Sequence, residues 1–131
     1  MKLLDGHRVA VLGTMADRPL AHYLASLGAE LGGSVEGASF VIDDLGRAAT
    51  ADLPIGPDAV HVSVTPFGSD GPRSDWRAGE LVASATGGAL RLTGRPGEMP
   101  VKEAGDACTF HAEMVAAAGA MAAHFARGTH G

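Results

Sequence analysis

The segment Ala107–Arg127 constrains the fold of this chain more than any other. It is apolar almost throughout, and its larger side chains include Met114, Val115, Met121 and Phe125. A helix that is apolar around nearly its whole circumference has to be covered on most sides. A chain of 131 residues can bury a core of its own but is small for enclosing such a helix. We therefore expect the helix to be largely buried, against a partner or further chain where this domain does not cover it.

Short apolar runs upstream are typical of strands in a buried parallel sheet. A helix of about ten residues is expected after the first run, with Pro19 in its first turn and Gly28 just past its end. Strands that alternate with helices favour βαβ units with right-handed crossovers. Residues 1–131 are thus predicted to form a single α/β domain, a Rossmann-like three-layer fold with a mostly parallel sheet. The predicted strands are Arg8–Leu12, Phe40–Ile42 and Ala59–Thr65.

Two glycine- and proline-containing stretches predict irregular loops before the long helix. Residues 66–78 hold two prolines and two glycines, and residues 94–105 hold Pro96 and Pro100. Between them, Glu80–Thr86 is expected to form a short helix that stops at the Gly87-Gly88 pair.

Composition excludes several classes of function. The formal net charge is −5, and the ten Lys and Arg residues form no basic stripe, which argues against a nucleic-acid partner. No apolar run has the length of a membrane span, and Asp5 interrupts the place where a signal peptide needs its apolar core. The single cysteine, Cys108, excludes an intrachain disulfide framework. We expect a cytoplasmic protein without a membrane or nucleic-acid partner.

Motifs for bound cofactors are also missing. The six histidines show no metal-ligand spacing, so no metal site is expected. The glycines from Gly28 to Gly37 do not open a helix after a strand in the dinucleotide-binding pattern. Cys108, at a helix start, is more typical of a small buried side chain than of a nucleophile.

Asp106 is the residue with the clearest chemical potential. An Asp immediately before a helix is most often an N-cap, whose carboxylate accepts a backbone N–H. The helix N-terminus also keeps a carboxylate ionised. An ionised, positioned carboxylate can attack a thioester carbonyl, so capping and nucleophilic roles are compatible.

A set of motifs in fixed order resembles the family III CoA-transferases, the formyl-CoA and carnitine-CoA transferase group. The motifs are Val-Ser-Val-Thr-Pro-Phe-Gly-Ser-Asp-Gly-Pro (62–72), Leu-Val-Ala-Ser-Ala-Thr-Gly-Gly (81–88) and Gly-Asp before an Ala-rich helix (105–106). The resemblance implies that Asp106 is the covalent nucleophile, that coenzyme A is a substrate and that no cofactor stays bound. It also implies acyl-CoA and a carboxylic acid as ligands, and a homodimer or a companion chain as partner.

The resemblance extends to further site residues. Gly87, Gly88 and Gly105 would form the oxyanion and substrate loops, with backbone N–H groups of the Gly87-Gly88 turn or of the helix start at Ala107 as donors. Weaker matches suggest CoA contacts at Thr14, Met15, Arg47 and Phe67. Glu80 falls where the family commonly has Asp, and it is expected to cap its own helix or to orient the site.

Departures from the family leave alternatives open. A strand-and-helix unit is expected to be missing between residue 29 and Phe40, and family members continue into a second Gly-rich loop and a second domain. A non-catalytic half or subunit is therefore one alternative, and the isolated chain is not expected to be fully active. The acyl-CoA racemase branch is another, but its histidine would fall at Gly79 or Glu80, and no His lies between His61 and His111.

Overall fold

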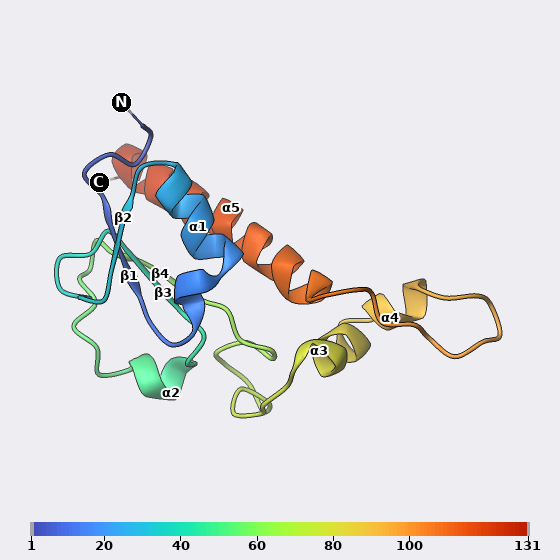
Figure 1. Cartoon of the computed structure of the whole chain (residues 1–131). Coiled ribbons are helices and arrows are strands. Elements are labelled where there is room, and N and C mark those ends of the chain that lie inside the picture. Colours follow the sequence, from blue (N-terminus) through green and yellow to red (C-terminus); the bar gives the residue numbers. More distant parts are fainter. Residues whose placement is uncertain (1, 131) are drawn as a thin grey trace.

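An open sheet of four parallel strands forms the centre of the structure, a computed structural model that describes residues 2–130 (Figure 1). The strands lie in the order β2-β1-β3-β4, and every neighbouring pair is parallel. The predicted α/β fold with a parallel sheet is therefore confirmed. The strand bounds are β1 (Arg8–Val11), β2 (Glu30–Gly32), β3 (Phe40–Asp43) and β4 (Val60–Ser63).

Strand β2 corrects the expectation that a whole strand-and-helix unit is missing. It follows the first helix and pairs with β1, with Arg8 opposite Glu30. Its three residues are all exposed at the edge of the sheet, so they lack the apolar run that marks a buried strand. Only the helix after it is absent, because residues 33–39 run to β3 without one.

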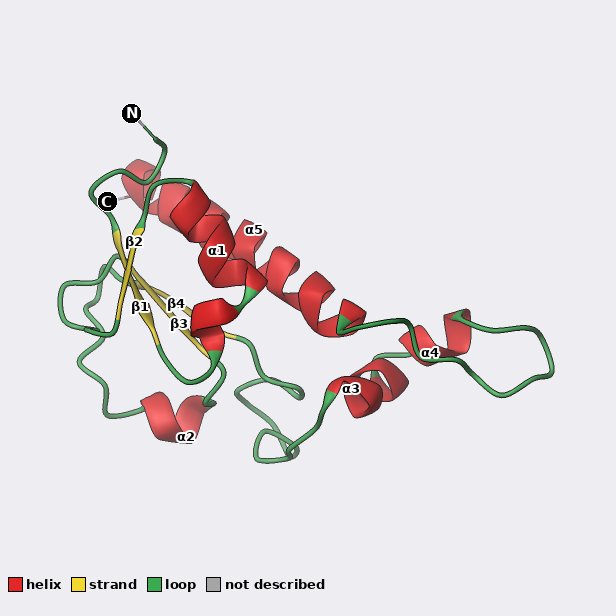
Figure 2. Ribbon diagram, in the orientation of Figure 1, coloured by secondary structure: helices red, strands yellow, loops and turns green. Residues whose placement is uncertain are grey.

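Two helices cover one face of the sheet (Figure 2). Helix α1 (Pro19–Ser26) begins with Pro19 at its first position, where a missing N–H costs nothing. It packs beside α5 (Ala107–His130), and a short 3-10 helix, η1 (Met15–Asp17), precedes it. The shared core contains Val9, Leu20, Leu24, Phe40, Ile42, Ala117 and Met121.

The opposite face of the sheet has a thinner cover. Because successive residues of a strand point to opposite sides, Ala10 and Val41 face a second, smaller cluster. Its other members come from the connections, including Val35, Ala38, Leu53 and Ile55. Helix α2 (Arg47–Thr50) is a single turn after β3. The third layer is thus built largely of loops.

Helix α5 is covered on one side only. Ala117, Ala120 and Met121 are buried against α1 and the sheet, whereas Val115 is 73% and Phe125 is 54% exposed. Within this domain, therefore, only one face of α5 is buried as expected, and the other face is exposed. The part of the chain that the structure describes contains no helix with the length and apolarity needed to cross a membrane.

Two short helices lie beyond the N-terminal end of α5, away from the sheet (Figure 1). Helix α3 (Glu80–Thr86) has the predicted bounds, and α4 (Ala89–Leu92) is an additional turn that follows the Gly87-Gly88 pair. Helix α3 contacts the start of α5, which brings two segments distant in sequence to one place.

Candidate functional site

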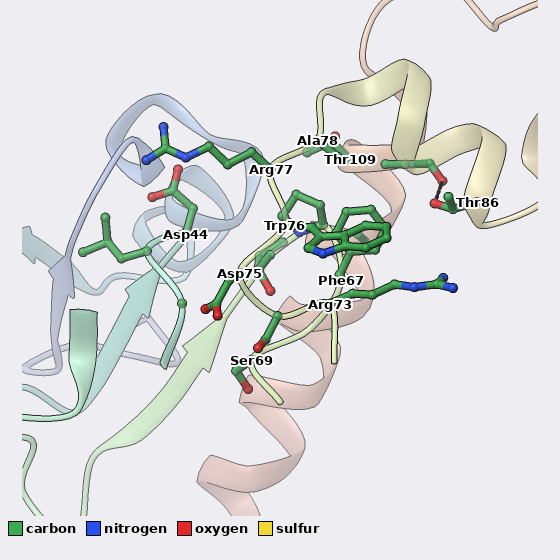
Figure 3. A pocket seen from close by; sticks show the side chains of 18 of the residues that line it. Asp44, Phe67, Ser69, Arg73, Asp75, Trp76, Arg77, Ala78, Thr86 and Thr109 are labelled. Atoms are coloured by element: carbon green, nitrogen blue, oxygen red, sulfur yellow. Dashed lines mark hydrogen bonds between the residues drawn. The ribbon is translucent and has the colours of Figure 1, made fainter. Parts of the chain in front are cut away.

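A cavity of about 1520 Å³ opens beyond the carboxyl ends of β3 and β4 (Figure 3). Its walls are the loop after β3, the long loop after β4, helix α3 and the first turn of α5. In open parallel sheets the carboxyl ends of the strands are the usual place for a ligand, because the loops that follow them converge there. The cavity is therefore the candidate site of this chain.

Asp106 stands at the edge of this cavity, immediately before α5. Its backbone carbonyl accepts the Phe110 N–H at 2.8 Å, which is the first bond of the helix. Its side chain is exposed and has no hydrogen-bond partner among the described residues. Asp106 therefore occupies the N-cap position without acting as a side-chain cap.

Glu80 performs that capping instead, from the first position of α3. Its Oε1 accepts the Cys108 N–H at 2.6 Å, and its Oε2 accepts the Thr109 N–H at 3.0 Å and the Thr109 hydroxyl at 2.5 Å. Burial raises the pKa of the Glu80 carboxyl, but the hydrogen bonds from Thr109 and Cys108 outweigh burial and lower the pKa below its usual value. Glu80 therefore caps the start of α5 and not its own helix, the first of the two roles expected for it.

The capping leaves one amide of α5 without an acceptor. The first N–H groups of a helix have no partner inside the helix. Those of Cys108 and Thr109 donate to Glu80, and that of Ala107 has no acceptor among the described residues. The N–H groups of the Gly87-Gly88 turn already donate to carbonyls of α3, at 2.8 and 3.3 Å. Oxyanion donors were expected either from the Gly87-Gly88 turn or from the start of α5. Of these, only the Ala107 N–H lacks an acceptor among the described residues.

Gly105 precedes Asp106 with a φ of +69°, a conformation that side chains strongly disfavour. A Cβ built at this position would meet no atom within 4 Å. The requirement for glycine here is therefore one of backbone conformation rather than of space. Gly87 lines the cavity, whereas Gly105 and Gly88 lie outside its wall.

The loop after β4 brings aromatic and cationic groups to the same cavity. Phe67 and Trp76 meet edge to face with 5.7 Å between ring centroids, and the Arg73 guanidinium lies 5.2 Å from the Trp76 ring centroid. Arg77 extends toward the loop that carries Asp44, away from Arg73 (Figure 3). From the sequence, residues 66–78 were predicted only as an irregular loop, and no role was expected for Arg73, Trp76 or Arg77. Their signal was the clustering of aromatic and basic residues in a glycine-rich loop.

The sequence model of CoA-transferase family III matches residues 40–131, which include the whole of α5 and every residue of the cavity wall except Arg18. The chain belongs to CoA-transferase family III. The predicted resemblance is thereby confirmed at the level of the family.

Solved structures share the fold of this family III chain. A hypothetical protein from Mycobacterium tuberculosis, Rv3272, has 19% identity and a TM-score of 0.74 over 93% of this chain and 49% of its own. An aspartate-to-alanine mutant of the same M. tuberculosis protein has 18% identity and a TM-score of 0.72, over 92% of this chain and 49% of its own. The chain thus spans about half the length of these structures. No curated protein matches it.

The four residues proposed for CoA contacts separate into two groups. Arg47 and Phe67 line the cavity, and Arg47 forms an ion pair with Asp70 that joins the loops after β3 and β4. Thr14 lies outside the lining, where its N–H donates to Asp44 Oδ1 at 3.1 Å. Met15 is 1% exposed and packs in the core, so its side chain offers no surface to a ligand.

Two further reactive side chains of the family III chain, those of His61 and Cys108, differ in where they lie relative to the cavity. His61 Nε2 lies 2.7 Å from Oδ2 of the buried Asp43, whose Oδ1 accepts the Ser63 hydroxyl, and no histidine lines the described cavity. Cys108 is partly exposed on the cavity wall, two residues after Asp106. Among residues 2–130, no cluster of three or more His, Cys, Asp or Glu side chains is arranged to hold a metal ion.

Proposed function

We propose that this chain supplies the nucleophilic carboxylate of a CoA-transferase that moves coenzyme A between an acyl-CoA and a carboxylic acid. The observation that carries the proposal is the state of Asp106. It lies at a helix N-terminus, lines an open cavity and has no hydrogen-bond partner for its carboxylate among the described residues. A carboxylate that faces an open cavity and accepts no hydrogen bond is free to attack a carbonyl carbon.

In the proposed first step, a carboxylate oxygen of Asp106 attacks the thioester carbonyl carbon. The carbon–sulfur bond breaks, and the electron pair leaves with sulfur as CoA thiolate. The product is a mixed anhydride between Asp106 and the acyl group. The thiolate then attacks the Asp106 carbonyl, which releases the first carboxylic acid as its carboxylate and leaves an aspartyl-CoA thioester.

The second half of the proposed reaction reverses these steps with the acceptor. The acceptor carboxylate displaces CoA thiolate from Asp106 to form a second anhydride. The thiolate attacks the acceptor's acyl carbon, which yields the new acyl-CoA and regenerates the Asp106 carboxylate. Each tetrahedral intermediate carries an oxyanion, and the Ala107 N–H, which follows the nucleophile and has no acceptor among the described residues, can donate to it.

The cavity has groups suited to the anionic and planar parts of coenzyme A. Three arginines of the wall, Arg47, Arg73 and Arg77, are exposed and can meet phosphate oxygens. Arg47 would exchange Asp70 for a phosphate, which costs little because both side chains of that ion pair are more than 70% exposed. Trp76, 57% exposed beside Phe67, offers a ring to a planar or apolar group.

Two alternatives give different results in one experiment. The racemase branch needs a histidine beside the aspartate, and no histidine lines the described cavity, which favours the transferase. A non-catalytic subunit would keep the fold and form no covalent intermediate. The experiment therefore measures the intermediate rather than complete turnover.

The complete assembly is incubated with acyl-CoA and hydroxylamine, which converts an aspartyl anhydride or thioester to a hydroxamate. Peptide mass spectrometry should find the hydroxamate at Asp106. Asp106→Ala should abolish it together with turnover. Asp70→Ala is the matched control, because it removes another carboxylate of the same cavity and should leave the adduct in place. An assembly that stays active with Asp106→Ala would refute the proposal.

A further inference from the structure

Glu80 and Asp106 compete, in principle, for the same two amides. A residue in the N-cap position normally accepts the N–H of the second or third helical residue. In α5 these are the N–H groups of Cys108 and Thr109, and Glu80 accepts both. The carboxylate of Asp106 is consequently released from the role that its position would give it.

We propose that Glu80 is a positioning residue that keeps Asp106 free by taking over the N-cap of α5. This inference rests on the proposed function, in which the carboxylate of Asp106 is the nucleophile and has to be free of hydrogen bonds to attack. Glu80 acts through the helix start and has no assigned contact with substrate. The Glu80 carboxylate also accepts the Thr109 hydroxyl at 2.5 Å. This third hydrogen bond holds the carboxylate against the two amides.

The geometry explains why the cap comes from another helix. The N–H groups of Cys108 and Thr109 need acceptors from outside the helix. If they have none, a nearby carboxylate is drawn to them as a hydrogen-bond acceptor. Without Glu80 the nearest carboxylate in sequence is Asp106 itself. An N-cap hydrogen bond stabilises by about 1 kcal/mol. If Asp106 formed one, the population of Asp106 with a free carboxylate would fall roughly fivefold.

A double-mutant cycle on the full chain tests the exchange without any measurement of activity. Asp106→Ala alone should leave the thermal unfolding midpoint almost unchanged, because Asp106 caps nothing. In the Glu80→Ala background the same substitution should lower the midpoint by about 3–5 °C, because Asp106 has become the cap. Equal effects of Asp106→Ala in the two backgrounds would overturn the proposal.

Two further variants keep the cycle interpretable. Ser84→Ala removes a 3.3 Å hydrogen bond to Glu80 Oε1 but leaves Glu80 on α5, so Asp106→Ala should stay neutral in that background. If Glu80→Ala fails to fold, Glu80→Gln retains one acceptor for the amides and should give a smaller coupling of the same sign. Absence of coupling in Glu80→Gln would then count against the proposal.

A second arm measures the hydroxamate in the complete assembly. Glu80→Ala should slow adduct formation at saturating acyl-CoA about fivefold, with an unchanged half-saturating concentration of acyl-CoA. A purely structural role predicts fewer active molecules with an unchanged rate for each of them, and that result would overturn the proposal. If the stability coupling is found but the unsubstituted assembly forms no adduct, the exchange of caps stands and the proposed function falls.

Discussion

The Glu113 carboxylate, fully buried on α5, holds Arg18 at the start of α1. Arg18 Nε donates to Glu113 Oε1 at 2.6 Å, and the other oxygen accepts the Leu20 N–H at 3.1 Å. Glu113 thus caps a neighbouring helix, as Glu80 does for α5. In both places a carboxylate from one helix satisfies the amides at the start of another, so capping and helix packing reinforce each other.

This pair gives an asymmetric prediction for stability. Arg18→Met should lower the free energy of unfolding by about 3–5 kcal/mol, because it leaves the Glu113 charge buried without its cation. Glu113→Gln should cost about 1–2 kcal/mol, because the amide oxygen still accepts the Leu20 N–H and Arg18 reaches solvent. Urea denaturation measures both, and a larger loss for Glu113→Gln would contradict this reasoning.

Gly13 is expected to be intolerant of a side chain. Its φ is +67°, and an added Cβ would lie 1.8 Å from Asp44 Oδ1, the atom that accepts the Thr14 N–H. Gly13→Ala should therefore cost the conformational penalty of about 1–2 kcal/mol and, in addition, the bond between Asp44 and Thr14. Gly105→Ala is the matched control, since its φ of +69° is equivalent and its Cβ would be in open space. Equal losses of unfolding free energy would show that the clash is relieved without cost.

His124 should make stability depend on pH. Burial lowers the pKa of His124, and repulsion from His7 and Arg127 lowers it further. The unfolded chain therefore binds the proton more readily than the folded one. His124 contributes full stability above its unfolded pKa of about 6.5, and this contribution is lost as the pH falls through 6.5 toward the folded pKa. Urea midpoints from pH 8 to pH 5 should decrease less in His124→Gln, and parallel curves would exclude His124 as the source.

The uncovered side of α5 should associate with another surface. Val115 and Phe125 remain largely exposed although they are apolar. We expect a second copy or a companion chain to cover them, because burying apolar surface contributes about 25 cal/mol per Å². Val115→Glu should weaken this association in analytical ultracentrifugation. Val101→Glu makes the same change at an exposed valine outside α5 and should not. A monomeric unsubstituted chain at high concentration, with no partner chain bound, would argue against this expectation.

Local patterns in the sequence determined much of the fold. The apolar runs identified β1, β3 and β4, and the Gly87-Gly88 stop gave the end of α3. The position of Asp106 directly before α5 was predicted correctly, since helix starts carry residue-by-residue signals. These elements are encoded by neighbours in the chain, and the sequence alone is sufficient for them.

Tertiary structure decided the features that depend on distant residues. Strand β2 is an exposed edge of three residues, and only its pairing with β1 makes it a strand. Met15 is buried because η1 turns its side chain into the core, which no local pattern indicates. The freedom of Asp106 depends on Glu80, whose amide partners lie 28 and 29 residues away. The sequence determined where the carboxylate stands, and the packing of α3 against α5 decided that it remains unbound, because only that contact provides a different acceptor for the helix amides.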